Sequence, residues 1–401
     1  MQKSDERRRE ILRWSVFAPL SLIGSWGMLG CRSTYSVEIN SIPPIRNFGQ
    51  LVGPDSNGVA LLPGYSSRIV ARSGSQPLLG SGYRWHKSPD GGATFRTPDD
   101  GWIYVSNSEV PSRGGGAGAL RFDAAGFLIA SYPILRNTTR NCAGGPTPWG
   151  TWLSCEEHPA GHVWECDPFG GFNARELPAL GTFQHEAAAV DPVSGFVYLT
   201  EDRPDGRFYR FIPNGNDLRG LPDLTSGVLQ AAEVHGPLEG IVEWHDILDP
   251  VGAVVATRHQ IALSTPFNRG EGAWYDSDFI YFATTGDNRI WAYDIARSEL
   301  VIIYDDDFFA DPVLKGVDNL TVSNRGDILV AEDGGDLQIV ALTSTGSVTP
   351  LVQLAGHRAS EITGPAFDPS GSRLYFSSQR GVDGFEGNGI TYEISGPFSL
   401  L

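Results

Sequence analysis

Beyond its first residues, the sequence has no run of lysine or arginine, no second apolar segment that could span a bilayer and no convincing amphipathic helix. The formal charge is −17, from 30 lysine and arginine residues against 47 aspartate and glutamate residues. An acidic chain without a basic patch is a poor partner for nucleic acid or for an anionic membrane surface. Glycine (49 residues) and proline (27 residues) are frequent, which indicates many turns and a large all-β domain.

The N-terminal segment is typical of an export signal. An arginine triplet at 7–9 precedes an uncharged, mostly apolar run at 14–29 that is short for a membrane span. Residues 8–13 resemble a twin-arginine signal, which exports proteins that have already folded. We therefore predict that residues 1–31 are a twin-arginine-like signal peptide and that the protein is exported.

Residues 28–31, Met-Leu-Gly-Cys, resemble a lipobox, in which Cys31 would be lipidated and become the mature N-terminus. A protein anchored in this way would lie in the periplasm or at the cell surface, and its only membrane contact would be the lipid at Cys31. Plain secretion with an unmodified or removed Cys31 is the alternative.

Few cysteines are present, and an odd number follows the signal. Cys142, Cys155 and Cys166 cannot all pair within one chain, so at least one thiol stays free in an oxidising compartment. Metal ligation is one reason for a free thiol. The alternative is a disulfide between Cys155 and Cys166, with Cys142 merely buried.

A group of strands recurs along the chain. Each copy has an apolar strand, a turn resembling Asp-Pro-x-Gly, a second strand that ends in acids, and a third strand after a glycine turn, as in AVDPVSGFVYLTEDRPDGRFYRF from Ala189. The ends of the second strands are marked by Glu109, Glu157, Asp202, Asp287, Asp333 and Arg380. Four of the five steps between these marks fit a propeller blade of roughly 40–50 residues.

The repeat predicts an all-β, six-bladed β-propeller with a metal site in its central channel, preceded by the export signal. Residues 32–401 would form this single domain, with an insertion at about 213–263 that explains the one long step. A pair of β-sandwiches is the structural alternative.

The repeat also predicts a ring of acids, because equivalent positions in the blades lie at a similar height around one axis. The acids that end second strands are Glu156, Glu157, Glu201, Asp202, Glu332 and Asp333, and those where inner strands should begin are Glu186, Glu271, Asp318 and Glu361. Crowded carboxylates favour cations, and calcium suits such oxygen ligands. Cys142 lies outside this register and would add a site for a softer metal. The alternative is that these acids are polar strand ends in solvent.

Arg269 lies two residues before Glu271, within the predicted anionic ring. A guanidinium there is well placed to bind a phosphoryl or carboxylate group through two hydrogen bonds. The alternative is that Arg269 only pairs with Glu271.

Several segments together resemble the PhoX-type alkaline phosphatases and their short bacterial relatives. They are NCAGGPTPWGTWLSCEE (141–157), QHEAAAVDP (184–192), YLTEDRPDGRFYRF (198–211), RGEG (269–272) and GPAFDPSG (364–371). The resemblance covers most of the chain from about Arg140 onward, and its first motif is long and highly specific.

This resemblance implies an exported phosphatase that hydrolyses small-molecule phosphate esters with a cluster of ferric iron and calcium. Cys142 would bind the iron, and Arg269 would bind phosphate. The carboxylate ligands of the cluster would be Glu157, Glu186 and Glu271, with neighbouring Glu156, and the calcium ligands would include Asp318 and Glu332 or Asp333. We also expect a monomer. The alternatives are a calcium-dependent propeller hydrolase of lactones or other esters, and a non-catalytic surface propeller that binds a partner.

Overall fold

Short antiparallel strands make up most of the chain in the computed structural model, which describes residues 49–344, 346–357 and 359–398. The helices in these ranges are 3-10 turns of three residues each: η1 (Pro178–Leu180), η2 (Thr257–His259), η3 (Thr285–Asp287), η4 (Asp306–Phe308) and η5 (Glu386–Asn388). Among the described residues, no helix is long and apolar enough to cross a membrane. The predicted signal at 1–31, including Cys31, lies outside the described residues.

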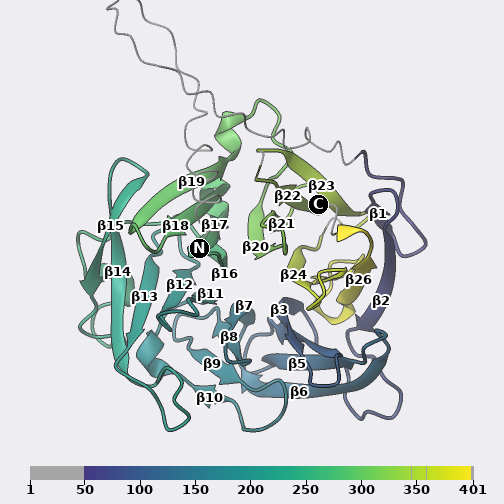
Figure 1. Ribbon diagram of the computed structural model, residues 1–401, viewed down its shortest axis with the longest axis horizontal. Helices are drawn as coiled ribbons and strands as arrows, with labels where there is room; N and C mark the ends of the chain where they lie inside the picture. Colours follow the sequence, from purple (N-terminus) through teal and green to yellow (C-terminus); the bar gives the residue numbers. More distant parts are fainter. Residues whose placement is uncertain (1–48, 345, 358, 399–401) are drawn as a thin grey trace, which may run out of the picture.

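The strands form five hydrogen-bonded sheets around a common centre (Figure 1). Two sheets have four consecutive strands each: β3 (Pro89–Arg96), β4 (Trp102–Ser108), β5 (Gly115–Phe122) and β6 (Leu128–Thr138), then β7 (Asn141–Pro146), β8 (Trp152–Glu156), β9 (Val163–Cys166) and β10 (Arg175–Glu176). The largest sheet has nine strands: β11 (His185–Val190), β12 (Val197–Glu201), β13 (Phe208–Pro213), β14 (Gly227–His235), β15 (Gly240–Asp246), β16 (Gly270–Asp276), β17 (Phe279–Thr284), β18 (Arg289–Asp294) and β19 (Glu299–Asp305).

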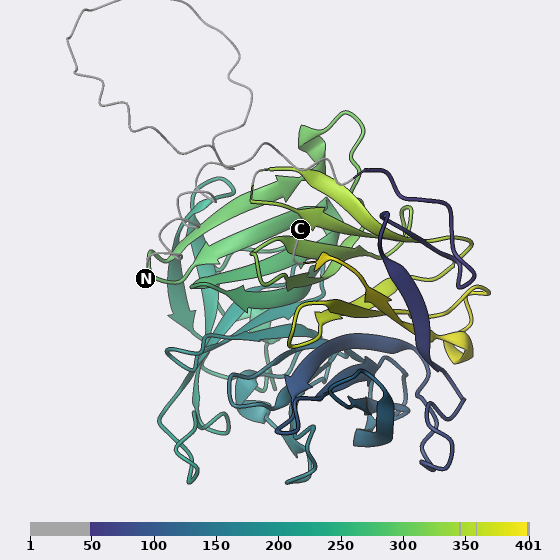
Figure 2. The same cartoon turned by 45° about the vertical axis from the view of Figure 1, so that its right-hand side comes forward.

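The last two sheets combine strands from both ends of the chain. One contains β20 (Val317–Val322), β21 (Ile328–Glu332), β22 (Gln338–Leu342), β23 (Val348–Leu354) and β1 (Val59–Leu61), and the other contains β24 (Ile362–Phe367), β25 (Arg373–Ser378), β26 (Ile390–Ser395) and β2 (Ser66–Arg72). Figures 1 and 2 show β2, in purple, beside the yellow C-terminal strands. Because β2 pairs with β26, the chain closes the ring with its own N-terminal strand.

The innermost strands form a closed ring, in which each contacts the next: β3, β7, β11, β16, β20 and β24. The all-β, propeller-like architecture is therefore confirmed. The expectation of six separate blades is wrong, because the described residues form five sheets. The reason is β15, which pairs with β14 on one side and with β19 on the other and so joins two meanders into one sheet.

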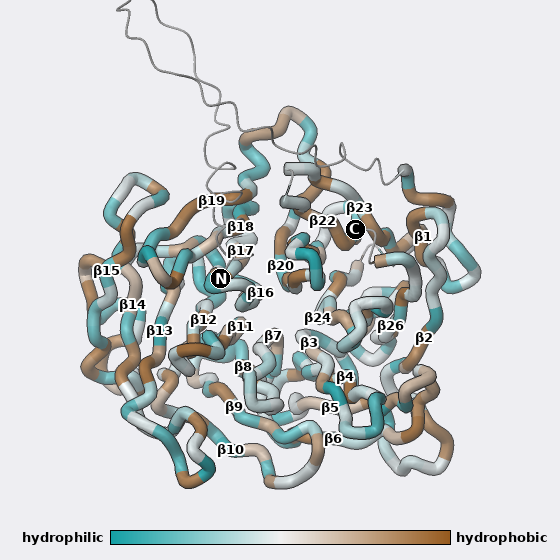
Figure 3. Tube along the Cα trace, viewed as in Figure 1, coloured by the Kyte–Doolittle hydropathy of each residue, from teal (hydrophilic) through white to brown (hydrophobic). Residues whose placement is uncertain are grey.

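Small residues allow the inner strands to approach one another closely. A Cβ atom on Gly145 in β7 would lie 1.7 Å from the carbonyl oxygen of Ala188 in β11, and one on Gly272 in β16 would lie 2.8 Å from the Cα atom of Asn319 in β20. Apolar side chains fill the space between sheets in several clusters, and Figure 3 shows hydrophobic and hydrophilic residues interspersed throughout the ring. The close packing brings the beginnings of the inner strands together.

Candidate metal centre

Equivalent positions on the six inner strands carry the chemistry of the centre. The first residue of each inner strand pairs with the last residue of the following strand, for example His185 with Glu201, and a β-bulge comes soon after it. The second residues of the six strands are Asp90, Cys142, Glu186, Glu271, Asp318 and Thr363. Cys142 therefore shares the position of the inner acids, and its placement outside the repeat is corrected. Bulges change the direction of nearby side chains, and here each bulge follows a side chain that points toward the centre of the ring.

A second set of equivalent positions follows the second strand of each meander. These residues are Glu109, Glu157, Asp202, Thr285, Asp333 and Gln379. Four of the six predicted register marks are correct, whereas Asp287 and Arg380 are wrong because the equivalent residues are Thr285 and Gln379. Asp287 instead binds Arg289 through a 2.8 Å ion pair.

Two groups of potential ligand atoms meet at Glu186. Within each group the donor atoms lie within 4.8 Å of one another: Cys142, Glu157 and Glu186 form the first, and Glu186, Glu271 and Asp318 form the second. Glu186 is fully buried, and no hydrogen-bond donor among the described residues reaches either of its carboxylate oxygens. A buried carboxylate without a hydrogen bond is costly, so Glu186 has the features of a group that binds a cation.

The electrostatics of these groups support the same interpretation. Burial, followed by the charges of Glu271, Glu157 and Asp318, raises the pKa of Glu186 well above its usual range. The pKa values of Glu271 and Asp318 are also raised well above their usual range, first by burial and then by neighbouring carboxylates. Without a cation, the protonated form of these acids is therefore favoured over the ionised form.

The donor set fits a mixed metal cluster. Cys142 offers a soft sulfur ligand beside Glu157 and Glu186, whereas Glu271 and Asp318 offer hard oxygens. Burial, with added effects of Asp90 and Glu186, raises the pKa of the Cys142 thiol well above its usual value. The thiol thus remains protonated unless a cation takes the place of its proton.

A third group of carboxylates was not predicted as a ligand set. Asp90, Glu109 and Glu361 have oxygens within 4.8 Å of one another. Gln379 Nε2 donates to Asp90 at 2.6 Å and to Glu109 at 3.0 Å. Burial and then the charge of Glu109 raise the pKa of Asp90 to about 7. In the sequence, Asp90 precedes two glycines, a pattern typical of a turn. The signal that could have identified it as a ligand is its position as the second residue of an inner strand.

Glu156 and Glu332, both predicted as metal ligands, lie outside these groups. Glu156 accepts hydrogen bonds from the backbone amides of Thr139 at 2.7 Å and His162 at 3.2 Å. Glu332 accepts from the amides of Lys315 at 2.9 Å and Gln338 at 2.9 Å. Successive side chains of a strand point to opposite faces, so each glutamate points away from the acid that follows it. These two carboxylates therefore hold adjacent loops in place, and neither belongs to a donor group among the described residues.

Asp333, the other predicted ligand at this strand end, lies nearer the centre. Its charge raises the pKa values of Asp318 and Glu361, which places it within electrostatic reach of two donor groups. It is not one of the donors that lie within 4.8 Å of two others among the described residues.

Arg269 lies at the edge of the second group. Its Nε and Nη2 atoms donate to the two carboxylate oxygens of Asp202 at 2.8 and 3.0 Å, and Nη2 also lies 3.2 Å from Glu271. The predicted contact with Glu271 is present, and Asp202 is an additional partner. The side chain remains 41% exposed, so the guanidinium is accessible from solution while two acids fix its position.

Two further arginines, which the sequence did not single out, contact acids of the centre. Arg140 Nη1 lies 3.6 Å from Glu109, and Arg380 Nη2 donates to Glu361 at 2.9 Å. Both side chains are partly exposed. With Arg269 they form what we call the arginine rim, defined as Arg140, Arg269 and Arg380.

None of the three described cysteines forms a disulfide. Cys155 and Cys166 are fully buried thiols, and burial raises the pKa of each well above its usual value. The alternative of a Cys155–Cys166 disulfide is therefore wrong.

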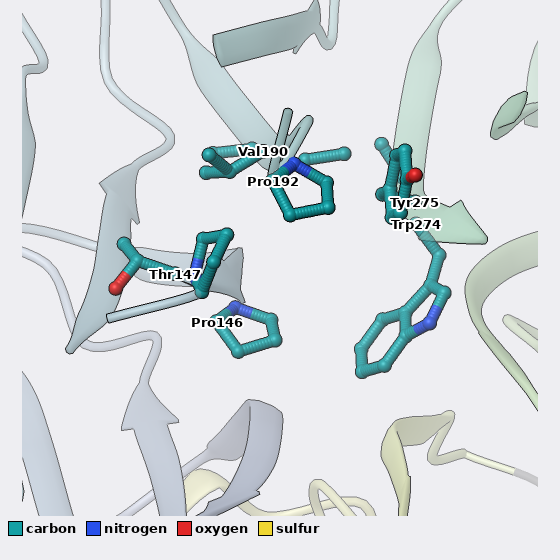
Figure 4. Close-up of a pocket in the computed structure, with 10 residues that line it drawn as sticks. Pro146, Thr147, Val190, Pro192, Trp274 and Tyr275 are labelled. Carbon is teal, nitrogen blue, oxygen red and sulfur yellow. The ribbon is translucent and has the colours of Figure 1, made fainter. Parts of the chain in front are cut away.

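An apolar cavity of about 250 Å³ lies at the other ends of β7, β11 and β16 (Figure 4). Pro146, Pro192 and Trp274 are among its lining residues, and none of the residues that line it is charged. Four residues of strand, or about 13 Å, separate Glu186 from Val190 at this end. The functional groups that could catalyse a reaction are therefore the clustered acids, and the lining of this cavity offers none that is charged.

Comparison with protein families identifies the chain. Residues 100–164 and 158–300 match the family model of alkaline phosphatase PhoX. The chain belongs to the PhoX family. It is therefore a phosphatase, and the predicted family is confirmed. The matched ranges contain Cys142, Glu157, Glu186 and Glu271.

A solved structure with the PhoX name agrees with this fold. The structure of Pseudomonas fluorescens PhoX in complex with vanadate, a transition state analogue, has a TM-score of 0.70 at 15% identity and covers 86% of this chain and 97% of that chain. A gluconolactonase from Xanthomonas campestris has a TM-score of 0.44 at 15% identity and covers 88% of this chain and 99% of that chain. No curated protein sequence matches the chain at a significant level.

Proposed function

We propose that this PhoX-family protein hydrolyses small-molecule phosphate esters at a cluster of ferric iron and calcium. The observation that carries the proposal is Glu186, a buried carboxylate without hydrogen-bond donors that is common to two groups of donor atoms. One of these groups contains a thiol and the other contains only carboxylates. This difference supports one softer and one harder cation side by side.

The residues that would hold the cluster follow from the donor groups. Cys142, Glu157 and Glu186 would hold iron, and Glu186, Glu271 and Asp318 would hold calcium, with Asp333 close by. The group of Asp90, Glu109 and Glu361 would hold a further hard cation. When bound, the cations would supply Lewis-acid charge to the phosphoryl oxygens and activate water.

Arg269 would orient the substrate. Asp202 holds two of its nitrogens, so the guanidinium plane is fixed before a substrate arrives. A pre-oriented guanidinium can donate to phosphoryl oxygens without losing much conformational freedom, and its charge balances charge that develops during the reaction. Removal of Arg269 would also leave Asp202 and Glu271 without their cationic partner.

Export would place this chemistry outside the cytoplasm. The twin-arginine-like segment at 8–13 supports transport of a folded protein, and Cys31 in its lipobox-like context supports a lipid anchor. Transport after folding would allow the cluster to be assembled before export. We expect a periplasmic or cell-surface monomer.

Metal analysis together with hydrolysis of an aryl phosphate tests the proposal. The exported protein should contain iron and calcium and should release phosphate. Calcium without iron, together with no phosphate release, would contradict it.

A Cys142→Ala variant makes this test more specific. It should lose iron and activity, because the softer donor is gone. Cys166→Ala is the matched control, since Cys166 is also a buried thiol but belongs to none of the donor groups; it should keep both metals. Full phosphate release by Cys142→Ala would instead support a calcium-dependent hydrolase that needs no thiolate.

A further inference from the structure

A second cluster of potential ligands lies between Glu186 and Glu271 in the sequence, on the hairpin of β14 and β15. Its sequence contains the same short motif twice, Glu233-Val-His235 and Glu243-Trp-His245. The two motifs lie on antiparallel strands, and Glu233 is directly opposite Glu243. All four polar side chains therefore share one face of the hairpin, because side chains two residues apart on a strand point the same way.

The opposite face of the hairpin packs against the protein. Val234 and Val242 are buried in an apolar cluster, and Trp244 packs against it and donates through its indole Nε1 to the Tyr293 hydroxyl at 3.1 Å. The alternating residues Glu233, His235, Glu243 and His245 consequently face outward. Packing thus fixes the backbone from which the four side chains project.

The four side chains converge in two diagonal pairs. His245 Nε2 lies 2.7 Å from Glu233 Oε2, and His235 Nε2 lies 3.0 Å from Glu243 Oε2. His235 Nδ1 also lies 3.9 Å from Glu233 Oε1. Ligand atoms of Glu233, Glu243 and His245 all lie within 4.8 Å of one another.

These distances suit a small tetrahedral cation. Zinc binds histidine nitrogen and carboxylate oxygen at about 2.0–2.2 Å, so neighbouring ligands of a tetrahedral site lie about 3.3 Å apart. The separations of 2.7 Å between His245 Nε2 and Glu233 Oε2 and of 3.0 Å between His235 Nε2 and Glu243 Oε2 are close to that value. Two neutral histidines and two carboxylates also carry the charge that balances one divalent ion.

Electrostatics explain why a cation is favourable there. Like charges directly opposite each other on paired strands are destabilising, and Glu233 and Glu243 are such a pair. A divalent cation between them would replace this repulsion with attraction. The cluster is accessible without unfolding, since the side chains of His235 and Glu243 are 49% and 58% exposed.

We propose that Glu233, Glu243 and His245 form a binding site for a zinc-like divalent transition metal, separate from the catalytic centre. His235, whose Nε2 lies 3.0 Å from Glu243, would be the adjacent fourth donor. The site would join β14 to β15, whose backbones pair at six positions. Metal binding would therefore stiffen this hairpin, which connects two meanders through the short pairing of β15 with β19 at residues 240–241.

Zinc binding by the full-length protein, purified with its own metals, tests this site. Equilibrium dialysis followed by metal analysis should show one more equivalent of zinc in the native protein than in His235→Ala/His245→Ala. The matched control is His259→Ala: His259 is half-exposed, and its Nε2 lies 2.8 Å from an Asp205 oxygen, but it lies outside the cluster. This control should bind as much zinc as the native protein.

A second variant guards against a folding defect. Glu243→Gln retains the shape of an exposed side chain and should weaken zinc binding by at least about 10-fold, as loss of even indirect support for a metal ligand does. Aryl phosphate hydrolysis should be unchanged in all three variants. Zinc should slow proteolysis of the turn at 236–239 in the native protein and in His259→Ala, but not in His235→Ala/His245→Ala. Equal zinc uptake by the native protein and the double variant would overturn the proposal, as would no zinc uptake by the native protein.

Discussion

Replacement of Glu186 by glutamine should have opposite effects on stability with and without metal. In the native protein, donor atoms of Glu157, Glu271 and Asp318 lie within 4.8 Å of those of Glu186. Glutamine retains the size of glutamate, but it removes the charge and adds two hydrogen-bond donors. Without metal this change relieves repulsion, whereas with metal it removes a ligand common to two groups.

The size of the effect follows from the distances. Two unit charges 4.8 Å apart repel by about 3.5 kcal/mol at an effective dielectric constant of 20. Three such pairs would cost about 10 kcal/mol, which is comparable to the net stability of a whole domain. The metal-free protein must therefore keep some of these acids protonated, which limits the cost. A glutamine that donates to the remaining carboxylates should contribute about 1.5–3 kcal/mol, so the metal-free variant should be more stable than the native protein by about that amount.

Urea unfolding with a chelator and with restored metals measures both effects. The matched control is Glu165→Gln, because Glu165 is also fully buried but accepts hydrogen bonds from Trp149, Thr151 and Arg175. This control should lose stability under both conditions. If Glu186→Gln also lost stability without metal, the carboxylates would not repel one another and the interpretation of Glu186 as a cation ligand would be refuted.

Three other predictions concern the arginine rim, the loops and acid stability. Arg269→Ala should lower kcat/KM for an aryl phosphate by about 10–100-fold through lost charged hydrogen bonds, with partial recovery in Arg269→Lys; an unchanged rate would remove Arg269 from the site. Glu332→Gln should keep its metal content but lose about 1–3 kcal/mol in urea unfolding, because two backbone amides lose a charged acceptor; loss of calcium would restore it as a ligand. Burial acts to raise the pKa of Glu393, but Arg68 and Tyr375 outweigh it and hold the pKa below its usual value of 4.5. The stability that Glu393 contributes is thus present above pH 4.5 and lost as the pH falls through the lower folded pKa. The difference in unfolding free energy between the native protein and Glu393→Gln should therefore shrink between about pH 6 and about pH 3. A constant difference would contradict the pKa shift.

The repeat predicted from the sequence located much of the centre, since strand ends and turns are local signals. Glu157, Asp202 and Asp333 lie directly after their strands, as predicted. Alternation within a strand shows which residue of an acid pair turns inward, but only when the last residue of the strand is known. Glu156 and Glu332 lie one residue earlier and therefore on the opposite face, which the sequence pattern alone could not distinguish.

Other features depend on contacts that the sequence does not specify locally. Asp90 belongs to the first inner strand, yet its neighbours across the ring come from the end of the chain, including Gln379 and Glu361. The joining of two meanders by β15 depends on two residue pairs with β19. Closure of the ring creates these long-range contacts, so single-strand patterns could not predict them.

The arrangement of charge explains how so acidic a protein can act on an anionic ester. If an arginine paired with Glu186, it would fill the space and neutralise the donor that two groups share. The arginines instead contact acids around it: Arg140 with Glu109, Arg269 with Asp202 and Glu271, and Arg380 with Glu361. Charges within a Debye length of about 8 Å of the entrance act on an approaching ligand, whereas the more distant surface acids are screened. The proposed cations within the centre and the arginine rim around it would together create a local positive field, so the overall charge of −17 need not repel the substrate.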